Sequence, residues 1–178
     1  MDWKYYRSHL QKPVRGKKKG ELTFLFHKAD VFKNLINDLS KPFLKVQFDK
    51  VACIDAMGFI LGAAIASKLN KGLLPIRKSG SLALRKKDLA QITLVDYSGK
   101  RKTLELNKTA VSKGEKFILV DDWIETGSQI KAAIKLIEKA GGKVVGISCV
   151  GIDLKYDVKQ LQKYKIVSVR QTAKDDWF

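Results

Sequence analysis

The sequence predicts an α/β fold in which a central, mostly parallel sheet is flanked by helices. Apolar runs of strand length begin at Val51 and at Phe117, and both are short and continuous, which is typical of strands covered on both faces. Each run leads through a turn into a helix-like segment, and strands that alternate with helices favour this fold class. With 178 residues, 45% of them hydrophobic, the chain is long enough for one compact domain with a substantial core.

We divide this compact unit into a basic N-terminal arm, residues 1–28, and a main domain, residues 29–178. A helix is predicted from about Ala29 to Leu39. The stretch Thr23–Phe26 has two interpretations: an aromatic platform for a ligand, or a small cluster that packs the arm onto the sheet. The clustered cations and glycines of the arm are Lys12, Arg15, Gly16, Lys17, Lys18, Lys19 and Gly20.

Two strands with polar ends are predicted next. The strand that begins at Val51 leads into the glycine-containing turn Asp55–Gly58, and an apolar helix rich in small residues extends to Ala66. The following strand begins at Leu73 and emerges into a basic loop that carries Arg77–Lys78 and is punctuated by glycine. Both strands therefore bring polar or charged residues to the place where they end.

A hairpin is predicted between this basic loop and the next buried strand. Turn residues stand at Asp96–Gly99, and Thr103–Leu106 follow them. Lys113–Gly114 then lead back towards the strand at Phe117. Turn residues between two such segments are typical of a hairpin.

The strand Phe117–Val120 delivers polar groups to the start of a helix. Asp121 and Asp122 fall at its carboxyl end, the edge where open α/β sheets bind ligands. The turn Thr126–Gln129 follows, and a helix start there offers free N–H groups and a positive dipole end. The helix has an apolar face and a glycine stop, made by Ile130, Ala133, Ile134, Ile137, Gly141 and Gly142. This arrangement predicts a sugar-phosphate site.

The segment Phe117–Gln129 resembles the 13-residue signature of type I phosphoribosyltransferases, which has apolar residues, two acids, three variable residues, then Thr-Gly and two more. Gln129 stands where the signature usually ends in Thr or Ser, and Glu125 places an acid at the edge of the predicted phosphate site. The resemblance extends over about residues 29–152. It implies a Rossmann-like core with a small N-terminal hood.

Other segments resemble adenine phosphoribosyltransferases in particular. Asp55–Gly58 is similar to their pyrophosphate-binding loop, but Met57 replaces the usual Arg and so removes a bidentate phosphate donor. Arg77–Lys78 match residues that reach pyrophosphate in those enzymes. Ile92 stands in place of a usual Tyr. Either loop amides and Mg²⁺ hold the pyrophosphate, or another cation substitutes for the Arg, and we expect weak turnover.

The resemblance implies a Mg²⁺-dependent purine phosphoribosyltransferase of nucleotide salvage. Such an enzyme transfers ribose 5-phosphate from 5-phospho-α-D-ribose 1-diphosphate (PRPP) to adenine or a related purine and releases pyrophosphate. The transition state is held to be oxocarbenium-like, so catalysis would rest on positioning and charge stabilisation. Relatives dimerise with the loop near Arg77 reaching towards the partner's site, which implies a homodimer. The sequence leaves the choice of base open.

The resemblance also assigns a role to each segment. Asp121 and Asp122 would hold the ribose hydroxyls and, through water, the metal ion. Glu125 is the candidate general base for the purine N–H. The 5′-phosphate would be held by Thr126, Gly127, Ser128 and Gln129. The pyrophosphate would be held by Asp55, Ala56, Met57, Gly58, Arg77 and Lys78.

The formal net charge of +17 requires a separate explanation. A substrate with several phosphates accounts for a basic cleft, and a generally solvated lysine-rich surface accounts for the rest. A surface of this kind also binds nucleic acid through counterion release. The alternative function is therefore a PRPP-sensing regulator on the same fold that binds RNA or DNA. The sequence contains no recognisable added nucleic-acid module, which disfavours this alternative.

Membrane and metal signals are absent from the sequence. The longest apolar run, Phe59–Ala66, is too short to cross a bilayer, and the residues after Met1 lack the apolar core of a signal peptide. We therefore expect a cytoplasmic protein. Cys53 and Cys149 lack the paired spacing of a zinc site and are predicted to be buried, reduced thiols.

Overall fold

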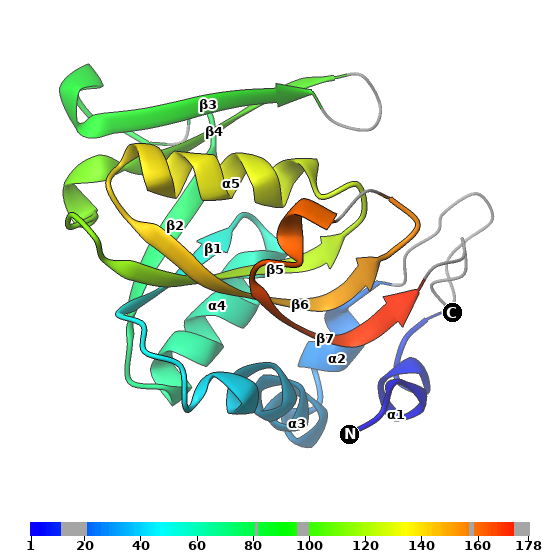
Figure 1. Cartoon of the computed structure of the whole chain (residues 1–178). Coiled ribbons are helices and arrows are strands. Elements are labelled where there is room, and N and C mark those ends of the chain that lie inside the picture. The colour runs from blue at the N-terminus through cyan, green and yellow to red at the C-terminus, as the bar shows by residue number, and fades with distance from the viewer. Residues whose placement is uncertain (12–20, 81, 96–99, 157–158, 173–178) are drawn as a thin grey trace.

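The structure is a computed structural model that describes residues 1–11, 21–80, 82–95, 100–156 and 159–172. Within these residues one sheet has seven strands: β1 (Lys50–Ile54), β2 (Gly72–Lys78), β3 (Leu89–Val95), β4 (Arg101–Asn107), β5 (Lys116–Ile124), β6 (Lys143–Asp153) and β7 (Lys165–Thr172). Their order is β3-β4-β2-β1-β5-β6-β7 (Figure 1). The last five of these run parallel, and β3 and β4 are antiparallel additions. The predicted α/β class with a mostly parallel sheet is confirmed.

The two apolar runs of the sequence form the central strands of this sheet. Val51–Ile54 and Phe117–Val120 are fully buried, since helices cover both faces of β1 and β5. The two strands pair in parallel with Cys53 opposite Val120. Asp55 and Asp121 therefore emerge at the same edge of the sheet.

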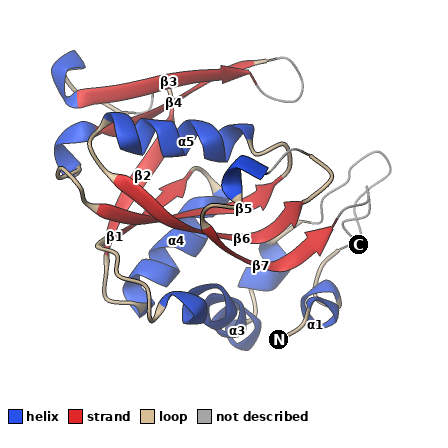
Figure 2. Cartoon of the chain, in the orientation of Figure 1, coloured by secondary structure: helices blue, strands red, loops and turns tan. Residues whose placement is uncertain are grey.

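Five α-helices lie on the two faces of the sheet within the described residues (Figure 2). They are α1 (Trp3–Arg7), α2 (Thr23–Phe26), α3 (Ala29–Ser40), α4 (Met57–Lys68) and α5 (Ser128–Lys139). The first four share one hydrophobic cluster on one face, and α5 packs on the other face with a second cluster. Short 3₁₀ turns are η1 (Lys41–Phe43), η2 (Lys86–Asp88), η3 (Lys108–Ala110) and η4 (Lys159–Leu161). None of the helices described is long and apolar enough to cross a membrane.

The predicted helices are confirmed with small differences in their bounds. The predicted helix Ala29–Leu39 is α3, which buries Val31, Leu35 and Leu39. The helix after the acid pair is α5, and it buries the predicted apolar face. Gly141 follows its end with φ +99°, a left-handed conformation that glycine adopts without strain.

The predicted hairpin is formed by β3 and β4, and it lies over α5 (Figure 1). Ala90, Leu104 and Leu106 are buried in the cluster that also contains the apolar face of α5. The hairpin joins the rest of the sheet through two register pairs between β2 and β4. Thus α5 is enclosed between the parallel strands and the hairpin. The predicted turn at 96–99 and the basic stretch 12–20 lie outside the described residues.

The N-terminal residues pack onto the same face as α3 and α4. Leu25 is fully buried, and the rings of Phe26 and Phe32 lie with centroids 5.6 Å apart. This favours the interpretation of Thr23–Phe26 as a packing cluster. Tyr6 is also fully buried and donates a hydrogen bond of 2.6 Å to Asp38. The division of the chain at residue 28 stays a prediction.

Candidate active site

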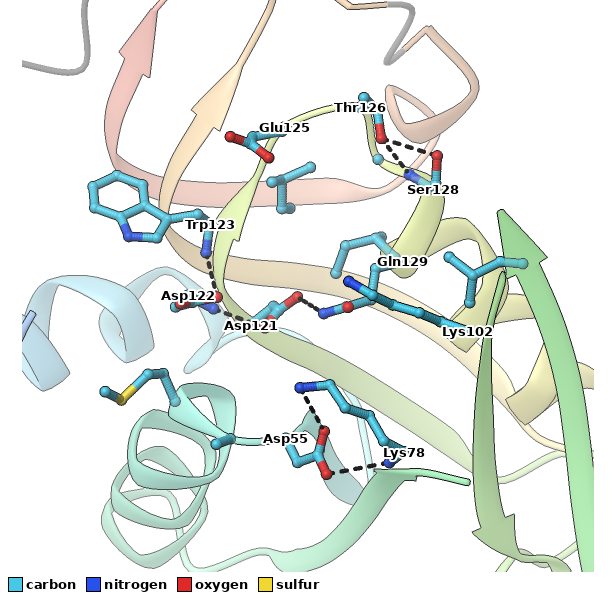
Figure 3. A pocket seen from close by; sticks show the side chains of 16 residues that line it. Asp55, Lys78, Lys102, Asp121, Asp122, Trp123, Glu125, Thr126, Ser128 and Gln129 are labelled. Atoms are coloured by element: carbon cyan, nitrogen blue, oxygen red, sulfur yellow. Dashed lines mark hydrogen bonds and ion pairs between the residues drawn. The ribbon is translucent and has the colours of Figure 1, made fainter. Parts of the chain in front are cut away.

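A cavity of about 310 Å³ opens at the carboxyl ends of β1 and β5, in front of the first turn of α5 (Figure 3). Its walls come from the turn after β1, the first residue of α4, β2, the hairpin, β5, the turn that follows β5, and α5. The lining residues are Asp55, Ala56, Met57, Lys78, Leu94, Lys102, Asp121, Asp122, Trp123, Ile124, Glu125, Thr126, Gly127, Ser128, Gln129 and Ile130. The structure thus brings together all the predicted site residues except Gly58 and Arg77, which lie outside the lining.

The acid pair has one buried member and one partly exposed member. Asp121 is 2% exposed, and its Oδ1 accepts a hydrogen bond of 3.0 Å from the Asp122 backbone N–H. Its Oδ2 accepts a bond of 2.9 Å from the Gln129 amide (Figure 3). Asp122 Oδ1 accepts a bond of 2.8 Å from the Trp123 backbone. The two carboxylates therefore have different environments, although they are neighbours in sequence.

Burial is the largest influence on Asp121. Burial and the adjacent charge of Asp122 raise the pKa of Asp121 well above its usual range, while the bonds from Asp122 N–H and Gln129 act in the opposite direction. Cys53 and Cys149, on the flanking strands, are free and buried as predicted. Burial and the charge of Asp121 raise the pKa of the Cys53 thiol to about 12. Burial is also the main cause that raises the pKa of the Cys149 thiol, so both thiols stay protonated.

The turn before α5 is built to receive an anion. Gly127 has φ +71°, which glycine adopts without strain, and this turn directs the chain into α5. The hydroxyls of Thr126 and Ser128 lie 2.9 Å apart, and Thr126 Oγ1 also accepts a bond of 3.3 Å from the Ser128 N–H. The first N–H groups of a helix lack intrahelical acceptors and carry the positive end of its dipole. A phosphate group is a suitable ligand for such a turn.

The turn after β1 faces the acid pair across the cavity. Asp55 Oδ2 accepts a hydrogen bond of 3.1 Å from the Lys78 backbone, and Lys78 Nζ lies 3.5 Å from Asp55 Oδ1. The peptide bond between Asp55 and Ala56 is cis. Gly58 begins the packing of α4 against β5, because an added Cβ would lie 3.1 Å from the Val120 carbonyl oxygen and 3.3 Å from Asp121 Oδ1. Gly58 thus stands behind the cavity.

Arg77 and Lys78 point to opposite faces of β2, because side chains alternate along a strand. Lys78 lines the cavity, whereas Arg77 lies opposite Glu105 of β4 in the sheet register. Glu105 is 1% exposed and accepts backbone hydrogen bonds from Gly80 at 3.3 Å and Leu82 at 2.8 Å. Arg77 therefore stands beside the segment that follows β2 and outside the cavity lining.

Sequence reasoning did not assign five of the lining residues: Leu94, Lys102, Trp123, Ile124 and Ile130. Trp123 is 7% exposed and meets Trp3 of α1 edge to face, with centroids 6.4 Å apart. Its position between the acid pair and Glu125 was a usable signal. No local pattern predicts Lys102 at this site, because its position depends on how the hairpin crosses α5. Ile92, which stands in place of the usual Tyr, lies inside β3, packs against the cluster around α5 and does not line the cavity.

Comparison with known proteins agrees with this geometry. Residues 24–178 match the phosphoribosyl transferase domain family. The chain is 39% identical to adenine phosphoribosyltransferase from Cereibacter sphaeroides over 84% of this chain and 82% of that protein. It is also 39% identical to the Brucella suis enzyme of the same name over 80% of this chain and 76% of that protein.

Solved structures show the same similarity. An adenine phosphoribosyltransferase from Thermoanaerobacter pseudethanolicus has a TM-score of 0.85 and 29% identity, covering 94% of this chain and 98% of that one. The Giardia lamblia enzyme, complexed with 9-deazaadenine, has a TM-score of 0.85 and 26% identity, covering 98% and 99%. Family match, sequence identity and fold agree over most of the molecule. The chain therefore belongs to the phosphoribosyltransferase family.

Proposed function

We propose that this protein is an adenine phosphoribosyltransferase, which transfers ribose 5-phosphate from PRPP to adenine and releases pyrophosphate. The observation that carries the proposal is the cavity in which Asp121 and Asp122 of β5 lie together with the turn Thr126–Gly127 and the first turn of α5. The relatives at 39% identity are adenine phosphoribosyltransferases, and a solved relative is complexed with 9-deazaadenine. These names support adenine over other bases.

The substrate would lie with its sugar over the acid pair. Asp121 and Asp122 would accept hydrogen bonds from the ribose hydroxyls, and Thr126–Gln129 would hold the 5′-phosphate through N–H groups and hydroxyls. Asp55–Gly58 and Arg77–Lys78 would hold the diphosphate. Lys78 supports this role best, since it lines the cavity beside Asp55. For Arg77 and Gly58, which lie outside the lining, the contribution would be indirect.

Magnesium fits this donor set as an ion shared with the substrate. The described residues contain no group of three or more His, Cys, Asp and Glu side chains that could hold a metal ion alone. Mg²⁺ is commonly bound by one or two carboxylates together with substrate phosphates, so Asp121 and Asp122 would hold it through water. When bound, the ion would neutralise charge on the departing diphosphate. Asp122 suits this role better because it is only partly buried.

The transfer forms a bond between a ring nitrogen of adenine and C1 of the ribose, and it breaks the bond between C1 and the diphosphate oxygen. The nitrogen loses its proton, and Glu125 is the candidate acceptor because it lines the same cavity as the acid pair. The transition state carries positive charge on the sugar. Carboxylates fixed beside the sugar stabilise that charge without rearranging.

The decisive experiment measures pyrophosphate release with PRPP, Mg²⁺ and a panel of purines and pyrimidines. We expect adenine to be the preferred base. The double variant Asp121→Asn with Asp122→Asn should abolish PRPP binding by calorimetry with an unchanged circular dichroism spectrum. Asp30→Asn, on the exposed surface of α3, is the matched control. Undiminished PRPP affinity in the double variant would overturn the assignment.

Two further expectations accompany this function. We propose a homodimer, as in relatives of this family, and a cytoplasmic location. Light scattering on the purified chain measures the first, and fractionation of cells that express it measures the second. A monomer that turns over at full rate would contradict the expected dimer.

A further inference from the structure

The charges of the cavity do not match an anionic substrate at first sight. Its lining holds four carboxylates and only two cations. One cation is Lys78, whose Nζ lies 3.5 Å from Asp55 Oδ1. Position 57, where the resembled loop carries Arg, holds an uncharged Met. The second cation of the lining is Lys102.

Lys102 reaches the cavity because of the way the hairpin crosses α5. It lies directly opposite Leu94 in the register of β3 and β4, and both residues line the cavity. This face of the hairpin therefore forms one wall of the site. Figure 3 shows the Lys102 side chain extending from β4 towards Gln129, while Lys78 turns back towards Asp55. Alternation along the strand puts the neighbouring Arg101 on the other, exposed face.

We propose that Lys102 binds the diphosphate of the substrate and supplies the positive charge that Met57 does not. This inference rests on the proposed function. Lys102 is assigned to the diphosphate rather than to the 5′-phosphate. The turn at Thr126–Ser128 already offers N–H groups, hydroxyls and a helix dipole to the 5′-phosphate. The Asp55–Gly58 turn offers a diphosphate no cation of its own. An ammonium group on a flexible stem binds phosphate as a point charge.

The test is the variant Lys102→Gln, with Arg101→Gln as its control. Both lose one positive charge from adjacent positions of β4, but only the first changes the cavity. Calorimetry in constant Mg²⁺ measures the affinity for pyrophosphate, PRPP and AMP, which carries a single phosphate. We expect Lys102→Gln to lower the affinity for pyrophosphate and for PRPP about ten- to hundredfold, which corresponds to about 1.4 to 2.8 kcal/mol. The affinity for AMP should stay within about twofold of the wild-type value. Arg101→Gln should leave all three unchanged.

Two further variants separate a charge effect from a structural one. Lys102→Arg keeps the cation and should retain pyrophosphate affinity within a few-fold. Adding Met57→Arg to Lys102→Gln should recover part of the lost affinity, because it restores a cation on the opposite wall. Circular dichroism and the thermal midpoint check that each variant is folded.

The possible results distinguish failure of this inference from failure of the proposed function. Unchanged pyrophosphate affinity in Lys102→Gln, or an equal loss for AMP, would overturn the inference while the proposed function stands. A wild-type chain that binds neither PRPP nor pyrophosphate would overturn the proposed function and this inference together. An equal loss in Arg101→Gln would reduce the effect to general surface charge and would also overturn the assignment.

Discussion

At the scale of single residues, the site depends on how Asp121 is kept in place. The carboxylate is almost fully buried, it neighbours Asp122, and the two thiols Cys53 and Cys149 flank it on β1 and β6. The nearest stabilising side-chain donor is the amide of Gln129. Gln129, which departs from the usual signature, thus stabilises Asp121, one of the two acids of that signature.

Replacing Gln129 with Leu should make the enzyme more sensitive to acid. The Gln129 amide stabilises the ionised carboxylate, so its loss raises the pKa of Asp121 further. A raised pKa means that the ionised form is lost at a higher pH, and the acid limb of the kcat/KM profile should move upward. We expect roughly a tenfold loss at pH 6 and a smaller loss at pH 8, since a hydrogen bond to a charged group contributes about 1.5 to 3 kcal/mol.

The matched control is Gln160→Leu, which removes an exposed amide away from the cavity and should leave the profile unchanged. A uniform loss at every pH in Gln129→Leu would show that Gln129 acts on the substrate and not through Asp121.

Gly127→Ala should weaken both the fold and the phosphate site. Its φ of +71° is unfavourable for a residue with a Cβ, by about 1 to 2 kcal/mol. Urea denaturation measures the loss of stability, and AMP binding should weaken as the turn before α5 shifts. Gly72→Ala is the control, because its added Cβ meets only the flexible side chain of Lys50. Equal stability losses in the two variants would contradict this account.

At the scale of elements, the sequence was most informative where local pattern and tertiary burial agree. β1 and β5 are apolar without interruption, because both faces are covered, and α5 repeats its apolar face at helical spacing. The position of the hairpin over α5 could not be predicted, since contacts between segments distant in sequence determine it. The place of Lys102 in the cavity depends on the same distant contacts, so no local pattern predicts it. Arg77 and Lys78 were both predicted to hold pyrophosphate, but side chains alternate along β2, so only Lys78 lines the cavity.

Glu105 organises the segment between β2 and β3, and its removal should destabilise that segment. Glu105→Ala leaves the N–H groups of Gly80 and Leu82 without this acceptor, and it also removes the partner of the Gln91 amide. We expect a loss of about 3 kcal/mol in urea denaturation, because the variant loses several hydrogen bonds to a buried, charged acceptor. Amide hydrogen exchange should accelerate at Gly80 and Leu82 before it does so in β1.

Glu138→Ala, on the exposed side of α5, is the control. It should lower the free energy of unfolding much less and leave amide exchange in the β2–β3 segment unchanged. Unaltered exchange at Gly80 and Leu82 in Glu105→Ala would show that other contacts hold this segment.

At the scale of the whole molecule, a strongly basic chain surrounds a cavity in which acids outnumber bases. The net charge of +17 therefore resides mainly outside the site. Part of it, Lys17–Lys19, lies outside the described residues, so its distribution relative to the cavity stays a prediction. The excess of positive charge attracts anions of many kinds from a distance.

The salt dependence of nucleic-acid binding distinguishes an enzyme with a solvated basic surface from a regulator that binds nucleic acid. If the protein is an enzyme with a solvated basic surface, affinity for RNA or DNA should fall with a log-log slope of about −0.9 per neutralised phosphate on duplex DNA and be weak at physiological salt. Saturating PRPP should leave it unchanged. Fluorescence anisotropy across a salt series measures both effects. Tight binding at physiological salt that responds to PRPP would instead favour the regulator.

The contact between Trp3 and Trp123 gives the site a built-in optical reporter. Trp123 lines the cavity, Trp3 meets it edge to face, and the guanidinium carbon of Arg170 lies 5.5 Å from the centre of the Trp3 ring. Indole emission responds to nearby charge and to water, so a bound anion or stacked base would alter the intrinsic fluorescence of the unlabelled chain. Ligand titrations could then be followed in real time, with Trp123→Phe as the spectroscopic blank. Because Trp3 belongs to α1, a shift of this helix on ligand binding would also change the emission wavelength.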